Sequence, residues 1–183
     1  AAMRTNATAA FALATLAAIA VYPSRATCAD IGKAGPKACS ALIVTADKSE
    51  DTAWTKKKTF RATKILDVRV RAVIPSTVEF EAADVVTFRF TTPKGNLYQT
   101  IDVPVRSSTK KGEAERRVPG YPFPLAVQQP KSTKVDGTPA QTVEARLPVG
   151  GTVIMESGLY GDWIVQAFVG GARPCSATFV LQP

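Results

Sequence analysis

The sequence predicts an all-β protein, an antiparallel β-sandwich preceded by an N-terminal hydrophobic segment. Three observations support this prediction. Apolar residues recur at every second position in several runs, glycine or proline bounds each run, and no helical spacing is convincing after Ser40. Such alternation is typical of strands with one buried face, and a series of short strands with turns between them favours a sandwich.

Length and composition predict one folded domain with an N-terminal extension. The chain has 183 residues, which is enough for one core of ordinary size and too few for two large ones. Hydrophobic residues make up 45% and charged residues 21%, whereas a disordered chain is poor in apolar residues and rich in charge of one sign. The chain should therefore fold.

The first 26 residues resemble a secretory signal peptide. Arg4 precedes an apolar run over residues 9–21, which is followed by Pro23 and by Ser24-Arg25-Ala26 as a cleavage site. The run is short for a membrane span, but a retained hydrophobic helix packed through its alanines remains an alternative, as does a lipid anchor on Cys28. Residues 27–40 form a connector in either case.

The strands begin with residues 64–74, in which Leu66, Val68, Val70 and Ile74 share one face. The clearest hairpin follows: alternating residues 85–90 and 101–105 flank a turn at Pro93-Lys94-Gly95-Asn96. Pro104 cannot donate a backbone hydrogen bond, which places its strand at an edge or a bulge.

The C-terminal third continues the pattern in four segments that we expect to be strands. They read TVEARLPV, GGTVIMES, GDWIVQAFVGG and PCSATFVLQP. We expect Trp163 in the core, because large aromatic residues dominate the cores of such domains.

The closing segment resembles the last hairpin of immunoglobulin-like β-sandwich domains of secreted bacterial proteins. It carries the pattern Gly161-x-Trp163-x-Val165, then Gly170-Gly171, then Cys175-x-x-x-Phe179-Val180. The resemblance covers about a fifth of the chain and implies an immunoglobulin-like fold over residues 41–183, without an active site.

The cysteine count is odd, so pairing leaves one thiol over. In an immunoglobulin-like sandwich the first and last strands can run parallel side by side. This would bring Cys39 and Cys175, each at a strand start, to the same end. The resemblance thus implies a Cys39–Cys175 disulfide, with Cys28–Cys39 as the alternative.

Residues 106–141 form the least strand-like part and predict a long, proline-rich and basic connection. Its middle holds Tyr121 and Phe123 among three prolines, which favours an extended segment suited to a partner's groove. The alternative is a loop held down by its own aromatic residues.

A basic strand face is the second candidate binding site. Its residues are Trp54, Lys56, Lys57, Lys58, Arg61, Lys64, Arg69 and Arg71. Basic residues interleaved with aromatic ones can bind single-stranded nucleic acid or acidic glycans, although charge runs are usually exposed surface. The net charge is +8, and loss of the signal with Arg4 and Arg25 lowers it by two. A basic protein favours anionic partners without choosing among them.

Catalytic chemistry is sparse. The chain has no histidine, which excludes Ser-His-Asp and Cys-His catalysis and histidine-based zinc sites. No glycine-rich phosphate loop occurs. We therefore expect no enzyme, no cofactor and no metal site.

The sequence favours a non-enzymatic, exported protein of the periplasm, the outer surface or the extracellular space, with N-terminal anchoring as one option. Its expected role is a structural or interaction subunit of a bacterial cell-envelope or surface assembly, with protein partners or self-assembly. The alternative is a periplasmic or secreted binding module for anionic glycan or lipid headgroups of a membrane surface. Nucleic acid is the less favoured partner for a secreted protein.

Overall fold

The computed structural model describes residues 39–46, 58–81, 84–106, 114–170, 172 and 174–183. They belong to one compact unit, Ala34–Pro183. The expected signal segment, the connector up to residue 38, Cys28, Trp54, Lys56 and Lys57 lie outside the described residues.

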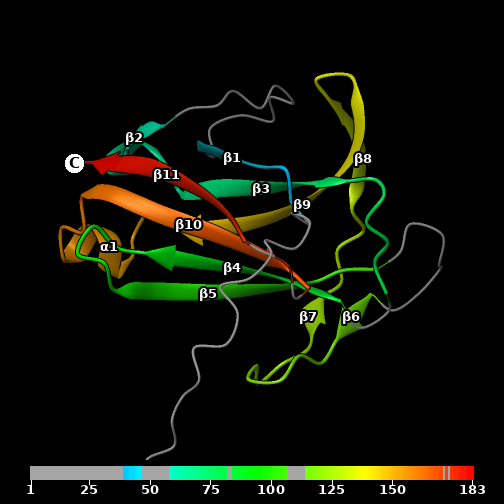
Figure 1. Cartoon of the computed structure of the whole chain (residues 1–183). Coiled ribbons are helices and arrows are strands. Elements are labelled where there is room, and N and C mark those ends of the chain that lie inside the picture. The colour runs from blue at the N-terminus through cyan, green and yellow to red at the C-terminus, as the bar shows by residue number, and fades with distance from the viewer. Residues whose placement is uncertain (1–38, 47–57, 82–83, 107–113, 171, 173) are drawn as a thin grey trace, which may run out of the picture. The chain divides into compact units, whose positions relative to one another are not determined.

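Two facing sheets form the body of this unit (Figure 1). The four-stranded sheet contains, in spatial order, β1 (Ala41–Ala46), β3 (Asp67–Pro75), β9 (Thr138–Pro148) and β8 (Lys131–Val135). The five-stranded sheet contains β2 (Thr59–Arg61), β11 (Cys175–Gln182), β10 (Gly161–Val169), β4 (Val85–Thr91) and β5 (Leu97–Pro104). A small third sheet pairs β6 (Glu115–Arg116) with β7 (Leu125–Ala126).

The strand order is that of an immunoglobulin-like sandwich. The order β1-β3-β9-β8 corresponds to the ABED sheet of such domains, and β11-β10-β4-β5 corresponds to the G-F-C-C′ sheet. The all-β prediction is confirmed. The core between the sheets contains Trp163, Phe60, Phe88, Phe90 and Phe179, all fully or almost fully buried.

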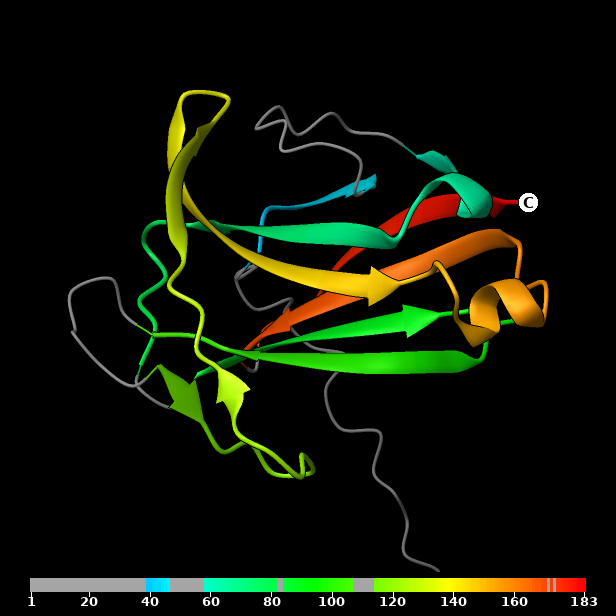
Figure 2. The same cartoon turned by 180° about the vertical axis from the view of Figure 1, so that it is seen from behind.

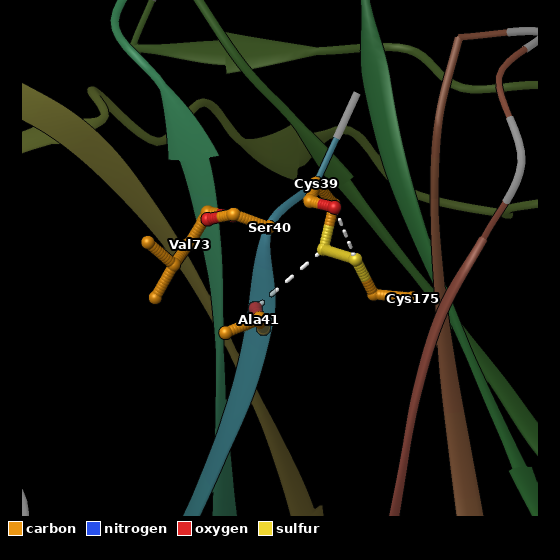
Figure 3. The surroundings of a disulfide bond; sticks show 5 residues. All are labelled: Cys39, Ser40, Ala41, Val73 and Cys175. Carbon is orange, nitrogen blue, oxygen red and sulfur yellow. Dashed lines mark hydrogen bonds between the residues drawn. A yellow bond between two sulfur atoms is a disulfide. The ribbon is translucent and has the colours of Figure 1, made fainter. Parts of the chain in front are cut away.

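The disulfide joins Cys39 to Cys175, as the resemblance implied (Figure 3). The two Cα atoms are 5.8 Å apart, and the bond ties the start of β1 in one sheet to the start of β11 in the other. Next to it, the backbone N–H and the hydroxyl of Ser40 both donate to the carbonyl oxygen of Val73 on β3. The bond therefore connects the two sheets at one end of the sandwich.

One detail of that implication needs correction. The strand that pairs in parallel with β11 is β2, through Val180↔Thr59 and the next two residue pairs, whereas β1 pairs antiparallel with β3. The first part of the chain thus contributes a strand to each sheet. The cysteines still meet because β1 and β11 both begin at the same end of the sandwich.

Most of the expected strands are present, and two positions differ. The segment GGTVIMES forms the short helix α1 (Val153–Glu156) instead of a strand. The Thr152 hydroxyl accepts a hydrogen bond from the Ile154 N–H and caps the helix. Leu66 is 71% exposed instead of buried, because β3 begins at Asp67 and Leu66 lies in the preceding turn, where its carbonyl accepts from Val149 and Gly150.

The expected long connection over residues 106–141 also needs correction. It contains β6, β7, β8 and the start of β9, and β8 and β9 form a hairpin that projects from the sandwich (Figure 2). Asp136 and Gly137, with φ of 50° and 78°, form the two-residue turn of this hairpin. Positive φ at both positions is the type I′ geometry that Asp-Gly favours.

Candidate functional site

The structure divides the expected basic face between the two sheets. Lys58, Arg61 and Lys64 are exposed and lie on or beside β2, at the edge of the five-stranded sheet; we call them the basic edge. Between them, Phe60 points into the core and packs edge-on against Phe179, with ring centroids 6.3 Å apart. Phe60 therefore offers no aromatic surface to a ligand at the basic edge.

Arg69 and Arg71 lie on β3, on the outer face of the four-stranded sheet. Val68 and Val70 are buried, so the alternation of β3 turns both arginines outward. They belong to a chain of ion pairs across β3 and β9. Asp67 approaches Arg69 at 3.8 Å and Arg146 at 3.9 Å, and Glu144 approaches Arg71 and Arg146 at 3.6 Å each.

The strand register explains why these charges meet. In β3 and β9, Arg69 is opposite Arg146 and Arg71 is opposite Glu144. Directly opposite residues of an antiparallel pair lie on the same face with neighbouring Cβ atoms. Glu144 lies between two guanidinium groups and separates their like charges.

A shallow groove lies beside this ion-pair chain, at the side of the sheet where β9 meets β8. We call it the charged groove; its volume is about 190 Å³, and its lining is Arg71, Gln128, Lys131, Thr142, Glu144 and Arg146. Three cations and one carboxylate line it, which leaves two net positive charges. No aromatic or aliphatic side chain belongs to the lining.

Gln128 fixes one wall of the charged groove. Its side-chain Oε1 accepts from the Glu144 N–H at 2.7 Å, and its Nε2 donates to the Glu144 carbonyl at 3.2 Å. The pairing of β8 with β9 runs from Val135↔Thr138 to Lys131↔Thr142. Beyond Thr142, the Gln128 side-chain amide thus forms the hydrogen bonds with the β9 backbone that a neighbouring strand would otherwise form. Its own backbone bonds to Pro104 and Arg106 at the end of β5, so Gln128 bridges the two sheets.

Arg71 is the most enclosed cation of the groove, with only 20% of its side chain exposed. Burial lowers its pKa from the usual value, and the charge of Glu144 with its hydrogen bond acts in the opposite direction. The guanidinium remains cationic at any physiological pH. Its field therefore acts in a partly desolvated groove, where electrostatic interactions are stronger than in bulk water.

The segment with Tyr121 and Phe123 forms a loop over residues 118–124, between β6 and β7. Val118, Pro119, Gly120 and Tyr121 make a turn in which the Tyr121 N–H donates to the Val118 carbonyl at 3.2 Å, with Gly120 at φ 90°. Proline followed by a residue of positive φ is typical of a type II turn.

Tyr121 ties this loop to the sandwich. Its hydroxyl accepts a hydrogen bond of 3.0 Å from the backbone N–H of Asp102 on the edge strand β5. Arg116, on β6, donates to the carbonyls of Asp84 and Val105 and attaches the small sheet to the body. Phe123, in contrast, is 76% exposed. Of the two expected aromatic residues, one therefore holds the loop and the other points to solvent.

Five of the six residues of the charged groove, all except Arg71, were absent from the sequence-based candidates. Thr142, Glu144 and Arg146 could have been placed together on an exposed strand face, because Val143, Ala145 and Leu147 alternate with them. No local pattern in the sequence indicates that β9 pairs with β3. Gln128 and Lys131 could not have been placed there from sequence patterns, since they come from the connection.

The part of the chain that the structure describes was searched for clusters of metal ligands and for membrane-spanning helices. There, no three acidic or cysteine side chains cluster as metal ligands. Among the same residues, no helix has the length and hydrophobicity to span a bilayer.

Comparison with known proteins finds a similarity of fold. No protein-family model and no curated protein sequence matches the chain. An immunoglobulin-like protein from Pseudomonas aeruginosa is similar in structure, with 12% sequence identity, coverage of 82% of this chain and 100% of that chain, and a TM-score of 0.42. The likeness is loose and concerns the fold.

Proposed function

We propose that this chain is a non-enzymatic, exported β-sandwich that acts as a structural or interaction subunit of a bacterial cell-envelope or surface assembly. The observation that carries the proposal is the loop over residues 118–124. Phe123 is exposed in this loop, and Tyr121 holds the loop on the sandwich through its hydrogen bond with Asp102. Export is supported by the Cys39–Cys175 disulfide, because such bonds persist in oxidising compartments. A signal peptide cleaved after Ala26 would provide the route.

The loop has the properties of a contact surface for a protein partner. A phenylalanine that moves from water into a pocket gains about 1.5–3 kcal/mol, and aromatic anchors contribute a large share of interface energy. Three prolines, the turn at Gly120 and the Tyr121–Asp102 hydrogen bond restrict the loop before binding. A restricted loop loses less conformational entropy when it docks.

The test is the mass of the native complex in the cells that make the protein. We expect wild-type protein to elute as a species heavier than the 19.4 kDa chain, and Phe123→Ser to elute as free chain. Tyr121→Phe, which removes the hydroxyl that holds the loop, should weaken association less than Phe123→Ser. Because Phe123 is exposed, its substitution should change the free energy of unfolding by no more than about 0.5 kcal/mol.

Leu97→Ser provides the matched control, since Leu97 is also a large exposed hydrophobic residue, at the start of β5. It should leave the native mass unchanged. A wild-type protein that is always monomeric would overturn the assembly role, and equal losses with Phe123→Ser and Leu97→Ser would remove the loop from the interface.

A second candidate function is the binding of anionic glycans or lipid headgroups. Two groups of cations favour it, the basic edge and the charged groove. Electrostatic binding of this kind should weaken as ionic strength rises.

A further inference from the structure

We propose that the charged groove is a binding site for a sugar acid, with the carboxylate of a uronic acid residue held by its cations. This inference rests on the second candidate function and assigns its site to the charged groove, on the outer face of the four-stranded sheet, and not to the basic edge. It is independent of the 118–124 loop.

The cations of the groove are arranged for a carboxylate. Lys131 is exposed, and 55% of the Arg146 side chain is exposed, so both can reach a ligand from opposite ends of the groove. The ion pairs of Arg146 with Glu144 and Asp67 measure 3.6 and 3.9 Å, longer than the 2.7–2.9 Å of a strong charge-assisted hydrogen bond. A planar carboxylate could therefore make a close contact with the Arg146 guanidinium in place of these longer ion pairs.

The remaining lining favours a sugar over a simple anion. Glu144 and the Thr142 hydroxyl are acceptors for sugar hydroxyl groups, and the Gln128 amide has a second N–H beyond the one that donates to Glu144. Glu144 would repel a doubly charged phosphate more than a singly charged carboxylate. A volume of about 190 Å³ suits one sugar ring. A ligand with one carboxylate and several hydroxyls would use every kind of polar group in the lining.

The walls of the groove are fixed before a ligand enters. Arg71, Thr142 and Glu144 lie on paired strands, and both amide atoms of Gln128 are bonded to the Glu144 backbone. Preorganisation of this kind reduces the entropic cost of binding.

The test is titration calorimetry of the whole chain with trigalacturonate, and with a neutral galactose trimer as the matched ligand control. We expect salt-sensitive binding of trigalacturonate and none of the neutral trimer. Lys131→Gln and Arg146→Gln should each weaken binding by about tenfold, the loss of one charge-assisted hydrogen bond.

Lys134→Gln is the matched protein control. It removes the same charge from the same strand, but Lys134 lies three residues along β8 and outside the groove lining. It should change the affinity by less than twofold.

The outcomes separate the site from the function. If Lys131→Gln and Arg146→Gln bind trigalacturonate like wild type while a variant with glutamine at Lys58, Arg61 and Lys64 does not, the groove is the wrong site and the second candidate function stands. If wild type shows no salt-sensitive binding of trigalacturonate, the sugar-acid site is wrong. If it then also fails to bind phosphatidylglycerol vesicles, the second candidate function falls with it.

Discussion

Removal of the Cys39–Cys175 disulfide should lower the free energy of unfolding by about 3–5 kcal/mol. The two cysteines are 136 residues apart in sequence, and a cross-link that closes so long a loop strongly restricts the unfolded chain. The chain-entropy model gives about 5 kcal/mol for a loop of this length. Since a domain of this size has about 5–15 kcal/mol in total, the change is a large fraction of the stability.

The measurement is urea denaturation of the double variant Cys39→Ala, Cys175→Ala. Wild type in the presence of a reductant should unfold at a similar urea concentration to the double variant. The single variant Cys28→Ala is the control, and it should keep both the disulfide and the wild-type midpoint. A double variant as stable as wild type would show that the bond between the sheets adds nothing to the stability of the fold.

Trp163→Ala should cost about 3–5 kcal/mol of unfolding free energy, the range for large aromatic residues in cores. Trp163 is fully buried on β10. Its ring stacks on Phe179 at a centroid distance of 6.1 Å and makes a T-shaped contact with Tyr98 at a centroid distance of 5.3 Å. Its Nε1–H donates to the Leu159 carbonyl at 2.9 Å. Alanine would leave a cavity and deprive that carbonyl of its donor.

Urea denaturation followed by far-ultraviolet circular dichroism measures this loss without the tryptophan signal. Trp163→Phe should lower the free energy of unfolding by less than Trp163→Ala, because phenylalanine retains most of the ring contacts. It loses the hydrogen bond to the Leu159 carbonyl. Ile164→Ala on the next position of the same strand is the matched control; its side chain is 40% exposed, and its loss should stay below about 1 kcal/mol. Equal effects at positions 163 and 164 would contradict the alternation that places Trp163 in the core.

Much of the fold could be predicted because its signals are local. The Trp163 strand, the hairpin around Gly95 and the exposed charges of Asp67–Pro75 all follow from period-two alternation and turn residues within a few positions. Two errors also have local causes. The apolar run Val153–Met155 is compatible with a strand, but Thr152 caps a short helix there. Asp136-Gly137 forms a hairpin turn inside the segment that was predicted to be a long connection.

The candidate sites were harder to predict because they depend on contacts between distant segments. Arg71 and Glu144 are 73 positions apart and meet only through the register of β3 with β9. Gln128 lines the groove because its side-chain amide forms hydrogen bonds with the backbone of Glu144. No pattern in the sequence predicts these bonds. Phe123 was proposed from its proline-rich surroundings; the structure shows that its side chain is exposed, and its binding role stays a prediction. Its partner in that segment, Tyr121, packs on the body of the protein as the alternative interpretation expected.

Photo-crosslinking at position 123 in the living source cells tests the central claim most directly, because it reports contact at the side chain itself. A photoreactive phenylalanine analogue replaces Phe123 in one strain and Leu97 in another. The interaction role predicts a discrete adduct heavier than the 19.4 kDa chain from position 123 and none from position 97. A free chain from both positions would contradict it.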